Sequence, residues 1–300
     1  MKRPHRFDCT QRVLTGLLAV LVMISASCAR SDSSQTSPVT SSYIENKGSD
    51  TIVNLALAWA ERYQAEHADV RISVTGGGSG TGIAALINGT VDIANASRQI
   101  KDEEISEAQA QGIDPVEFII ARDAIAVIVN PENPVSELTL QQISDIYSGK
   151  ISNWSEVGGE DRPIVRLSRE TNSGTHVYFL ETVLRLGDSD SKTLFSMDTL
   201  LLPSSEGIVA EVRQNPNAIG YDGLGYVPED LKMIAIAEEE GGAYVLPAIE
   251  TVNDKTYPIA RDLYMYTNGE PTGVTKEYLD WIFSPEAQEI VAELGFVPIK

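Results

Sequence analysis

The sequence predicts an α/β protein made of two lobes with a cleft between them. Short apolar strands alternate with amphipathic helices along residues 43–94, an order typical of a sheet covered by helices. Two apolar strands far apart in the chain, residues 124–130 and 263–267, are interpreted as crossovers between the lobes. We therefore expect lobe one to hold residues 43–125 and 260–300, and lobe two to hold residues 126–259.

Each element of lobe one follows from the hydrophobic spacing. Strands are expected at residues 43–45, 70–75 and 91–94, and helices at residues 51–65 and 83–87. The second helix ends at Asn88-Gly89, a common stop signal. In such a fold, ligand groups lie at the carboxyl ends of the strands.

Three loops repeat one chemical pattern just before a helix. Residues 48–51, 76–82 and 168–175 combine glycines with Ser and Thr hydroxyls. The first N–H groups of a helix lack internal partners and lie at the positive end of its dipole. Glycine lets a ligand approach the backbone closely, and the hydroxyls add donors. Together the three loops predict an oxyanion site.

The glycine loop argues against ATP and NAD as ligands. Gly82 is followed by Ile83, so the lysine of a P-loop is missing. The spacing also departs from the dinucleotide fingerprint. No cofactor is expected, and a purely structural glycine turn remains the alternative for this loop taken alone.

Two arginines are candidates to face the anion. Arg169 lies four residues before Ser173-Gly174-Thr175 and could fold over an anion as a bidentate fork. The alternative is a surface pair with Glu170. Arg98 ends the strand after the glycine loop and could point into the same cleft; its alternative is a surface pair with Asp102 or Glu103.

Asp50 is the exception among the donors, because it is a carboxylate in an anion loop. It could cap the helix that follows it. Alternatively it could accept the proton that hydrogen phosphate carries and sulfate lacks, which would favour phosphate.

The sequence offers no machinery for catalysis. The sequence contains no Ser-His-Asp order, no P-loop and no spacing typical of a zinc or calcium site. His67 and His176 have no other candidate metal ligands near them in the sequence. A secreted phosphatase or phosphotransferase is therefore the weaker hypothesis, and we expect a binding protein without a metal. Trp154 is expected in the core.

The N-terminal segment predicts export. Basic residues precede an apolar stretch at residues 13–24 that is too short to span a bilayer as a mature helix, and Cys28 follows. Residues 1–27 are interpreted as a lipoprotein signal, Cys28 as the lipidated residue and residues 28–42 as a Ser-rich tether. Cleavage without lipidation is the alternative. A formal charge of −20 argues against nucleic acid as a partner.

In order along the chain, these motifs resemble the substrate-binding protein of the phosphate ABC importer, the PstS family. The resemblance rests on the signal, the three loops, and the segments 91–98, 147–154 and 217–221, and it covers nearly the whole mature chain. It implies a type II periplasmic-binding-protein clamshell with two crossover strands, closing on one phosphate without chemistry.

The resemblance also implies a set of site residues. The phosphate-binding residues are expected to be Ser49, Asp50, Thr51, Ser79, Gly80, Thr81, Arg98, Arg169, Ser173, Gly174 and Thr175. At position 98 one well-known branch of the family carries an acidic proton acceptor, whereas this chain has arginine. The acceptor is then either Asp50 or absent.

The expected function is an extracytoplasmic receptor that captures inorganic phosphate and delivers it to permease subunits of an ABC importer. The protein would be a monomer held by lipid on the periplasmic or cell-surface face of the cytoplasmic membrane. Alternatives are a receptor for sulfate, molybdate or tungstate, and a phosphate-sensing or adhesion protein without transport.

Overall fold

A computed structural model of the chain describes residues 41–299. The predicted signal segment, Cys28 and most of the predicted tether lie outside the described residues. Ser42, assigned to the tether, instead begins the first strand. Within residues 41–299, which belong to one compact unit, no helix is both long and apolar enough to cross a membrane.

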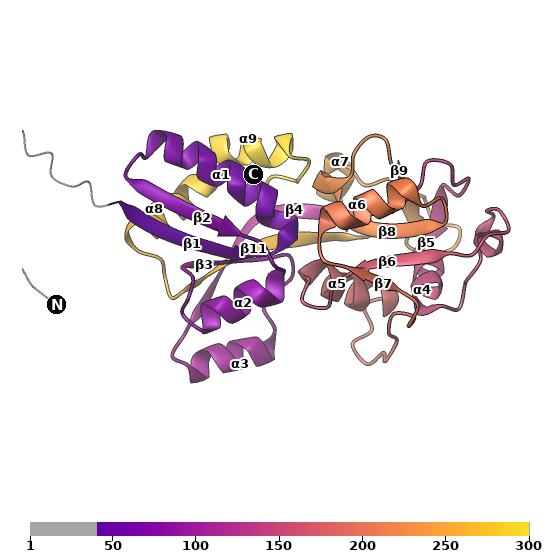
Figure 1. Cartoon of the computed structure of the whole chain (residues 1–300), viewed down its shortest axis with the longest axis horizontal. Coiled ribbons are helices and arrows are strands. Elements are labelled where there is room, and N and C mark those ends of the chain that lie inside the picture. The colour runs from indigo at the N-terminus through magenta and orange to yellow at the C-terminus, as the bar shows by residue number, and fades with distance from the viewer. Residues whose placement is uncertain (1–40, 300) are drawn as a thin grey trace, which may run out of the picture. The chain divides into compact units, whose positions relative to one another are not determined.

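Lobe one is a sheet with helices on both faces (Figure 1). Its parallel strands are β1 (Ser42–Gly48), β2 (Val70–Thr75) and β3 (Ile93–Ala96). Its helices are α1 (Asp50–Glu66), α2 (Ser79–Ile87), α3 (Asp102–Ala110), α8 (Gly273–Ile282) and α9 (Pro285–Glu293). One apolar face of α1, centred on Trp59 and Tyr63, packs with α8 and α9 on one side of the sheet. Helices α2 and α3 cover the other side.

Lobe two has the same layered construction. Its strands are β5 (Glu137–Thr139), β6 (Val165–Arg169), β7 (Leu200–Leu202), β8 (Ala218–Gly223), β9 (Lys232–Met233) and β10 (Ala235–Ala237). Its helices are α4 (Leu140–Ser148), α5 (Gly174–Phe179), α6 (Ser205–Gln214) and α7 (Ile249–Asn253). Short turns are η1 (Trp154–Val157), the π-helical turn η2 (Leu180–Leu184) and η3 (Leu224–Tyr226). Strands β6, β7 and β8 are parallel.

The lobes share one long strand, β4 (Pro115–Val129). Up to Ala124 it pairs with the antiparallel β11 (Ala260–Asn268), and from Ile125 it pairs with β8. In the described residues, the resulting strand order is β2-β1-β3-β11-β4-β8-β6-β7. The change of partner at residues 124 and 125 lies close to the predicted boundary of lobe one.

Both predicted crossover strands exist, but their extents differ from expectation. Strand β4 begins at Pro115, nine residues before the predicted start, because its first five residues are only partly buried or exposed and Glu117 interrupts the apolar run. Strand β11 pairs only with lobe-one partners, including β3. The return between lobes therefore lies at residues 259 and 260, where Ile125 donates its N–H to the carbonyl of Ile259 at 2.8 Å.

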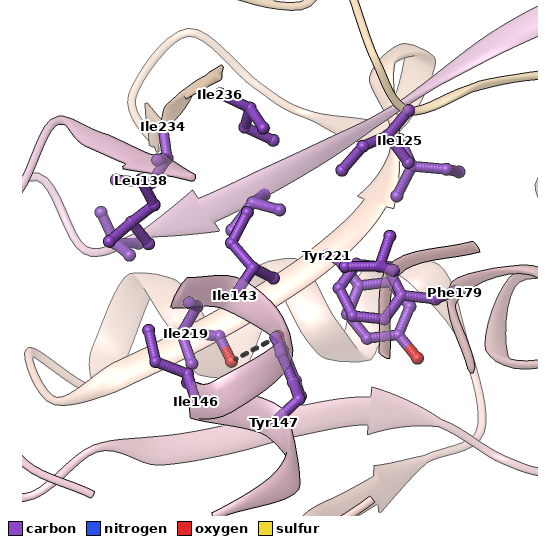
Figure 2. Close-up of a cluster of buried hydrophobic side chains, with 14 of the residues drawn as sticks. Ile125, Leu138, Ile143, Ile146, Tyr147, Phe179, Ile219, Tyr221, Ile234 and Ile236 are labelled. Atoms are coloured by element: carbon purple, nitrogen blue, oxygen red, sulfur yellow. Dashed lines mark hydrogen bonds between the residues drawn. The ribbon is translucent and has the colours of Figure 1, made fainter. Parts of the chain in front are cut away.

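The core of lobe two fixes the strands that carry the site. Strand β4 points Ile125, Val127 and Val129 into a buried cluster with α4 and α5. In this cluster the rings of Phe179 and Tyr221 stack 3.6 Å apart at an angle of 4° (Figure 2). The Tyr147 hydroxyl donates to the carbonyl of Ile219 at 3.3 Å, which satisfies a buried polar group. Trp154 is fully buried, as expected.

Candidate functional site

The site lies where the carboxyl ends of the parallel strands of both lobes meet. Strands β1, β2 and β3 end in lobe one, and β6 and β7 end in lobe two. The loops that follow these strands begin α1, α2, α5 and α6. All three predicted anion loops are thus brought together, although the first and third are more than 100 residues apart in the chain.

Lobe one contributes a cluster of buried serine hydroxyls. The Ser49 hydroxyl donates to the hydroxyl of Ser97 at 2.9 Å, and the Ser79 hydroxyl lies 3.2 Å from the same oxygen. The backbone N–H of Ser97 donates to the Ser79 hydroxyl oxygen at 3.0 Å. All three serines are at most 2% exposed. Because hydroxyls can donate as well as accept, the cluster can turn hydrogen atoms toward an anion.

Direct hydrogen bonds join the loops of the two lobes. The hydroxyl oxygens of Thr51 in α1 and Thr175 in α5 are 2.9 Å apart. The N–H of Gly80 donates to the carbonyl of Asn172 at 3.0 Å. The Asn172 amide in turn donates to the carbonyl of Gly77 at 2.9 Å. The lobes therefore meet at the predicted loops.

Glycine is required where the two lobes approach most closely. A Cβ added to Gly174 would lie 2.3 Å from the Ser79 hydroxyl oxygen and 2.6 Å from that of Ser97. Gly78 adopts φ +92°, and a Cβ there would meet the Asn172 carbonyl oxygen at 2.7 Å. Any side chain at either position would push the lobes apart.

Arg169 is the central charge of the site. It ends β6, is 1% exposed, and donates from Nη2 to the Asp50 carboxylate at 2.6 Å. Its guanidinium also donates to the Ser205 hydroxyl and to the carbonyl of Pro203, each at 2.9 Å. Its Nε donates to no atom of the described chain. Arg169 therefore pairs with Asp50 of the other lobe rather than with its neighbour Glu170.

Asp50 does not cap its helix. Ser49 occupies the cap position, and Asp50 is the first residue of α1. The Asp50 carboxylate instead accepts from the N–H of Gly77 at 2.9 Å and from Arg169. The capping alternative is wrong because the helix begins one residue earlier than expected. The carboxylate is thus part of the interlobe contact.

A buried carboxylate lies behind Arg169. Asp222, at the end of β8, accepts from the Ser205 hydroxyl at 2.9 Å and from the N–H of Gly223 at 2.8 Å. Burial raises the pKa of Asp222 to about 6, although the charge of Arg169 opposes this shift. Ser205 thus joins Asp222 to the guanidinium that faces Asp50.

Arg98 does not present a free guanidinium to the cleft in this structure. Its Nη1 and Nη2 donate to both carboxylate oxygens of Glu104, at 2.8 and 2.6 Å. The expected alternative partners were Asp102 and Glu103, so the surface-pair hypothesis named the wrong carboxylate. Burial opposes ionisation of Glu104, but its hydrogen bonds with Arg98 lower the pKa of this carboxyl overall.

Two further predicted hydroxyls are used locally. The Thr81 hydroxyl donates to the carbonyl of Gly77 at 2.6 Å. Ser173 is the N-cap of α5 and accepts from the N–H of Thr175 at 3.2 Å. Both lie in the predicted loops, and their role toward a ligand stays a prediction.

Several residues at the site were missed by the sequence reasoning. They are Ser97, Asp123, Asn172, Ser205, Asp222 and Arg261. Asp123 and Arg261 form a buried ion pair at 2.9 Å, 0% and 2% exposed. One signal in the sequence could have found this pair. Asp123 and Arg261 each lie next to one of the two apolar crossover strands, and a charge buried there requires a partner of opposite sign.

This arrangement can bind an anion through oriented hydrogen-bond donors around the buried charge of Arg169. Among residues 41–299, no three His, Cys, Asp or Glu side chains are grouped to hold a metal ion. His176 is buried, its Nδ1 lies 3.0 Å from the Ser168 hydroxyl oxygen, and burial lowers its pKa.

Known proteins resemble this chain over most of its length. Residues 33–286 match the model of the PBP superfamily domain. The phosphate-binding protein PstS of Pseudomonas aeruginosa is 33% identical over 273 residues, covering 85% of this chain and 83% of that protein. PstS of Bacillus subtilis is 32% identical over 296 residues, covering 96% of this chain and 93% of that protein.

Solved structures extend the similarity to three dimensions. A substrate-binding protein from Clostridium perfringens with bound phosphate has a TM-score of 0.76 and 34% identity, over 86% of this chain and all of that one. An ABC-type phosphate transport receptor from Vibrio cholerae has a TM-score of 0.68 and 30% identity, over 85% and 99% of the two chains.

Proposed function

The chain belongs to the PstS family of phosphate-binding proteins, and from this premise we propose that it binds inorganic phosphate between its lobes and delivers it to an ABC importer. The observation that carries the proposal is the convergence of Arg169, Asp50 and the hydroxyls of both lobes at one buried place. The fold is the two-lobed type II fold of the phosphate-binding structures. The family is one of binding proteins, and we infer capture without turnover.

The proposed phosphate-binding residues have two roles: some recognise the negative charge of the anion, and one recognises the proton of hydrogen phosphate. Arg169 offers its charge and the unpartnered Nε to the anion. Ser49, Ser79, Thr51 and Thr175 offer hydroxyl donors from both lobes. Asp50 lies against Arg169 and can accept the proton of hydrogen phosphate, whereas sulfate has no proton to offer and would meet an unpaired like charge.

The expected energetics are sufficient for tight capture. Micromolar affinity corresponds to about −8 kcal/mol. Charge-assisted hydrogen bonds contribute about 1.5 to 3 kcal/mol each, so a few of them exceed this value before ordering costs are subtracted. Because ligand groups come from both lobes, binding would favour the closed arrangement.

Three finer features of the proposal concern the setting of the receptor. We propose a lipid anchor at Cys28, permease subunits of a phosphate importer as partners, and a monomeric receptor outside the cytoplasmic membrane. The anchor is supported by the signal pattern ahead of Cys28. Metabolic labelling with a fatty acid, compared between the wild type and Cys28→Ser, tests it directly.

The proposal is tested by titration calorimetry of the phosphate-stripped protein with phosphate, repeated in excess sulfate. Tight one-to-one binding that survives sulfate is expected. Asp50→Asn should reduce the preference for phosphate over sulfate by about 10-fold or more, the loss of roughly one charge-assisted hydrogen bond. Glu170→Gln removes the same charge next to Arg169 from an exposed position and should leave the preference unchanged.

Two outcomes would contradict the proposal in different ways. Phosphate binding that sulfate, molybdate or tungstate displaces would assign the site to another oxyanion. Unchanged preference in Asp50→Asn would leave phosphate as the ligand but remove Asp50 as the reader of its proton.

A further inference from the structure

A buried ion pair lies where the chain passes between the lobes. Asp123 of β4 and Arg261 of β11 are cross-strand partners, one residue before β4 exchanges β11 for β8 as its neighbour. Arg261 donates to one carboxylate oxygen of Asp123 from Nη2 at 2.9 Å and from Nε at 3.3 Å. The side chains are 2% and 0% exposed.

The neighbouring cross-strand pair shows how unusual this burial is. Arg122 and Asp262 are partners one residue along the same two strands, with the charges exchanged between strands. Their side chains are 42% and 36% exposed, and the closest atoms are 3.5 Å apart. Burying an ion pair costs desolvation that its own attraction often fails to repay. The value of the buried pair therefore lies in what the remaining donors of Arg261 hold.

Those donors contact the anion loops of both lobes. Nη1 donates to the carbonyl of Ser97 at 2.9 Å. Nη2 donates to the Thr175 hydroxyl oxygen at 3.0 Å and lies 3.3 Å from that of Thr51. Thr51 belongs to lobe one and Thr175 to lobe two, so one guanidinium contacts both lobes.

These contacts fix the direction in which the threonine hydroxyls donate. A hydroxyl has one hydrogen atom and two acceptor lone pairs. Arg261 can only donate, so the threonine oxygens act as acceptors toward it. The 2.9 Å contact between the threonines uses one hydroxyl hydrogen, and the second hydrogen must point away from Arg261.

We propose that Arg261, held by Asp123, is a positioning residue of the anion site that joins the lobes through Thr51 and Thr175 and directs the remaining threonine hydroxyl hydrogen away from itself as a donor. Arg261 is not itself assigned as a ligand, because its hydrogen bonds in this structure go to Asp123, Ser97 and the threonines. The proposal deepens the proposed phosphate function and rests on it.

The first test compares Arg261→Gln with Arg122→Gln in the full chain. Phosphate affinity is measured by calorimetry, and closure by hydrogen exchange of residues 76–82, whose Gly80 N–H bonds to the other lobe. Arg261→Gln should weaken phosphate binding by about 10- to 100-fold, as loss of hydrogen bonds from a charged donor predicts. Exchange of residues 76–82 should become faster even without phosphate, while residues 205–214 of α6 stay unchanged. Arg122→Gln should change neither measurement by more than about twofold.

A second variant covers the case in which Arg261→Gln leaves Asp123 buried without a partner and fails to fold. The double variant Asp123→Asn, Arg261→Gln removes both charges and leaves an amide at each position, and it should show the same weakened binding and faster local exchange. Combining Arg261→Gln with Thr175→Val should lose less than the product of the two single effects, because part of the Arg261 effect acts through the Thr175 hydroxyl.

Near wild-type binding and exchange in the folded double variant would overturn the proposal, as would losses that multiply in the Thr175 combination. Faster exchange everywhere, including α6, would also overturn it by showing a general loss of stability. If the wild type binds no phosphate, the proposed function fails; the exchange measurements made without phosphate still decide whether Arg261 joins the lobes.

Discussion

The two lobes have the same α/β construction but bring different chemistry to the cleft. Lobe one contributes neutral hydroxyls on short loops, with Ser49, Ser79 and Ser97 clustered within hydrogen-bond distance. Lobe two contributes the buried charge of Arg169, supported by Ser205 and Asp222. The one lobe-one carboxylate in this contact, Asp50, lies on that charge. The comparison indicates that the charge proposed to contact the anion comes from lobe two, and that lobe one contributes mainly neutral donors.

Arg169→Ala should have the largest effect, because it removes the charge that lobe two contributes. Phosphate binding is expected to weaken at least about 100-fold, the value of two or more charge-assisted hydrogen bonds. Calorimetry measures the loss, and circular dichroism checks that the variant is folded. Micromolar or tighter binding by this variant would show that the charge of lobe two is not what holds the anion.

Gly174→Ala tests whether phosphate binding needs the close contact between the two lobes at Gly174. The new methyl group would overlap the Ser79 and Ser97 hydroxyls of lobe one. Overpacking of this kind typically costs about 1 to 3 kcal/mol, so binding should weaken about 10- to 100-fold.

Gly207→Ala is the matched control for this test. It lies in α6 of the same lobe, where a Cβ would make only an ordinary 3.5 Å contact with the Ser204 hydroxyl oxygen. The control should bind normally and gain up to about 1 kcal/mol in free energy of unfolding. Equal affinities for the two alanine variants would refute the requirement for close contact at Gly174.

Arg98→Gln should have the smallest effect, because Glu104 already holds this guanidinium in lobe one. A loss of about threefold or less in phosphate affinity is expected, because the opposite charge of Glu104 at 2.6 Å offsets the charge of Arg98. Competition with a fluorescent phosphate reporter can resolve so small a difference. A loss above about 10-fold would show that a charge of lobe one also contacts the anion, which would contradict this division between the lobes.

Much of the fold could be predicted because it depends on local patterns. Strand β2 occurs at the predicted residues, and both predicted lobe-one helices exist, although α1 begins at Asp50 and α2 at Ser79, earlier than the predicted residues 51 and 83. Strand β4 was predicted too short because its first five residues are only partly buried or exposed and lack a continuous apolar pattern. The assignment of residues to lobes was predicted from the two apolar strands. The point at which β4 changes its neighbour from β11 to β8 lies next to the predicted boundary.

The site was predictable only in its local part. Loops that combine glycines with Ser and Thr indicate hydrogen-bond donors from a few consecutive residues, so the three loops could be identified from the sequence. The partner of Arg169 lies 119 residues away and the partner of Arg261 lies 138 residues away. Such pairs are set by the sheet register, which a single sequence does not specify. The same reason explains why Asp222 and Ser205 were missed.

The strand shared by both lobes limits the ways in which they can move. Because β4 is hydrogen-bonded to β11 in one half and to β8 in the other, sliding one lobe along the other would break at least one of these ladders. Twisting about the strand needs only changes of backbone dihedrals near residues 124 and 125 and leaves the ladders intact. The shared strand therefore favours rotation over sliding as the relative movement of the lobes.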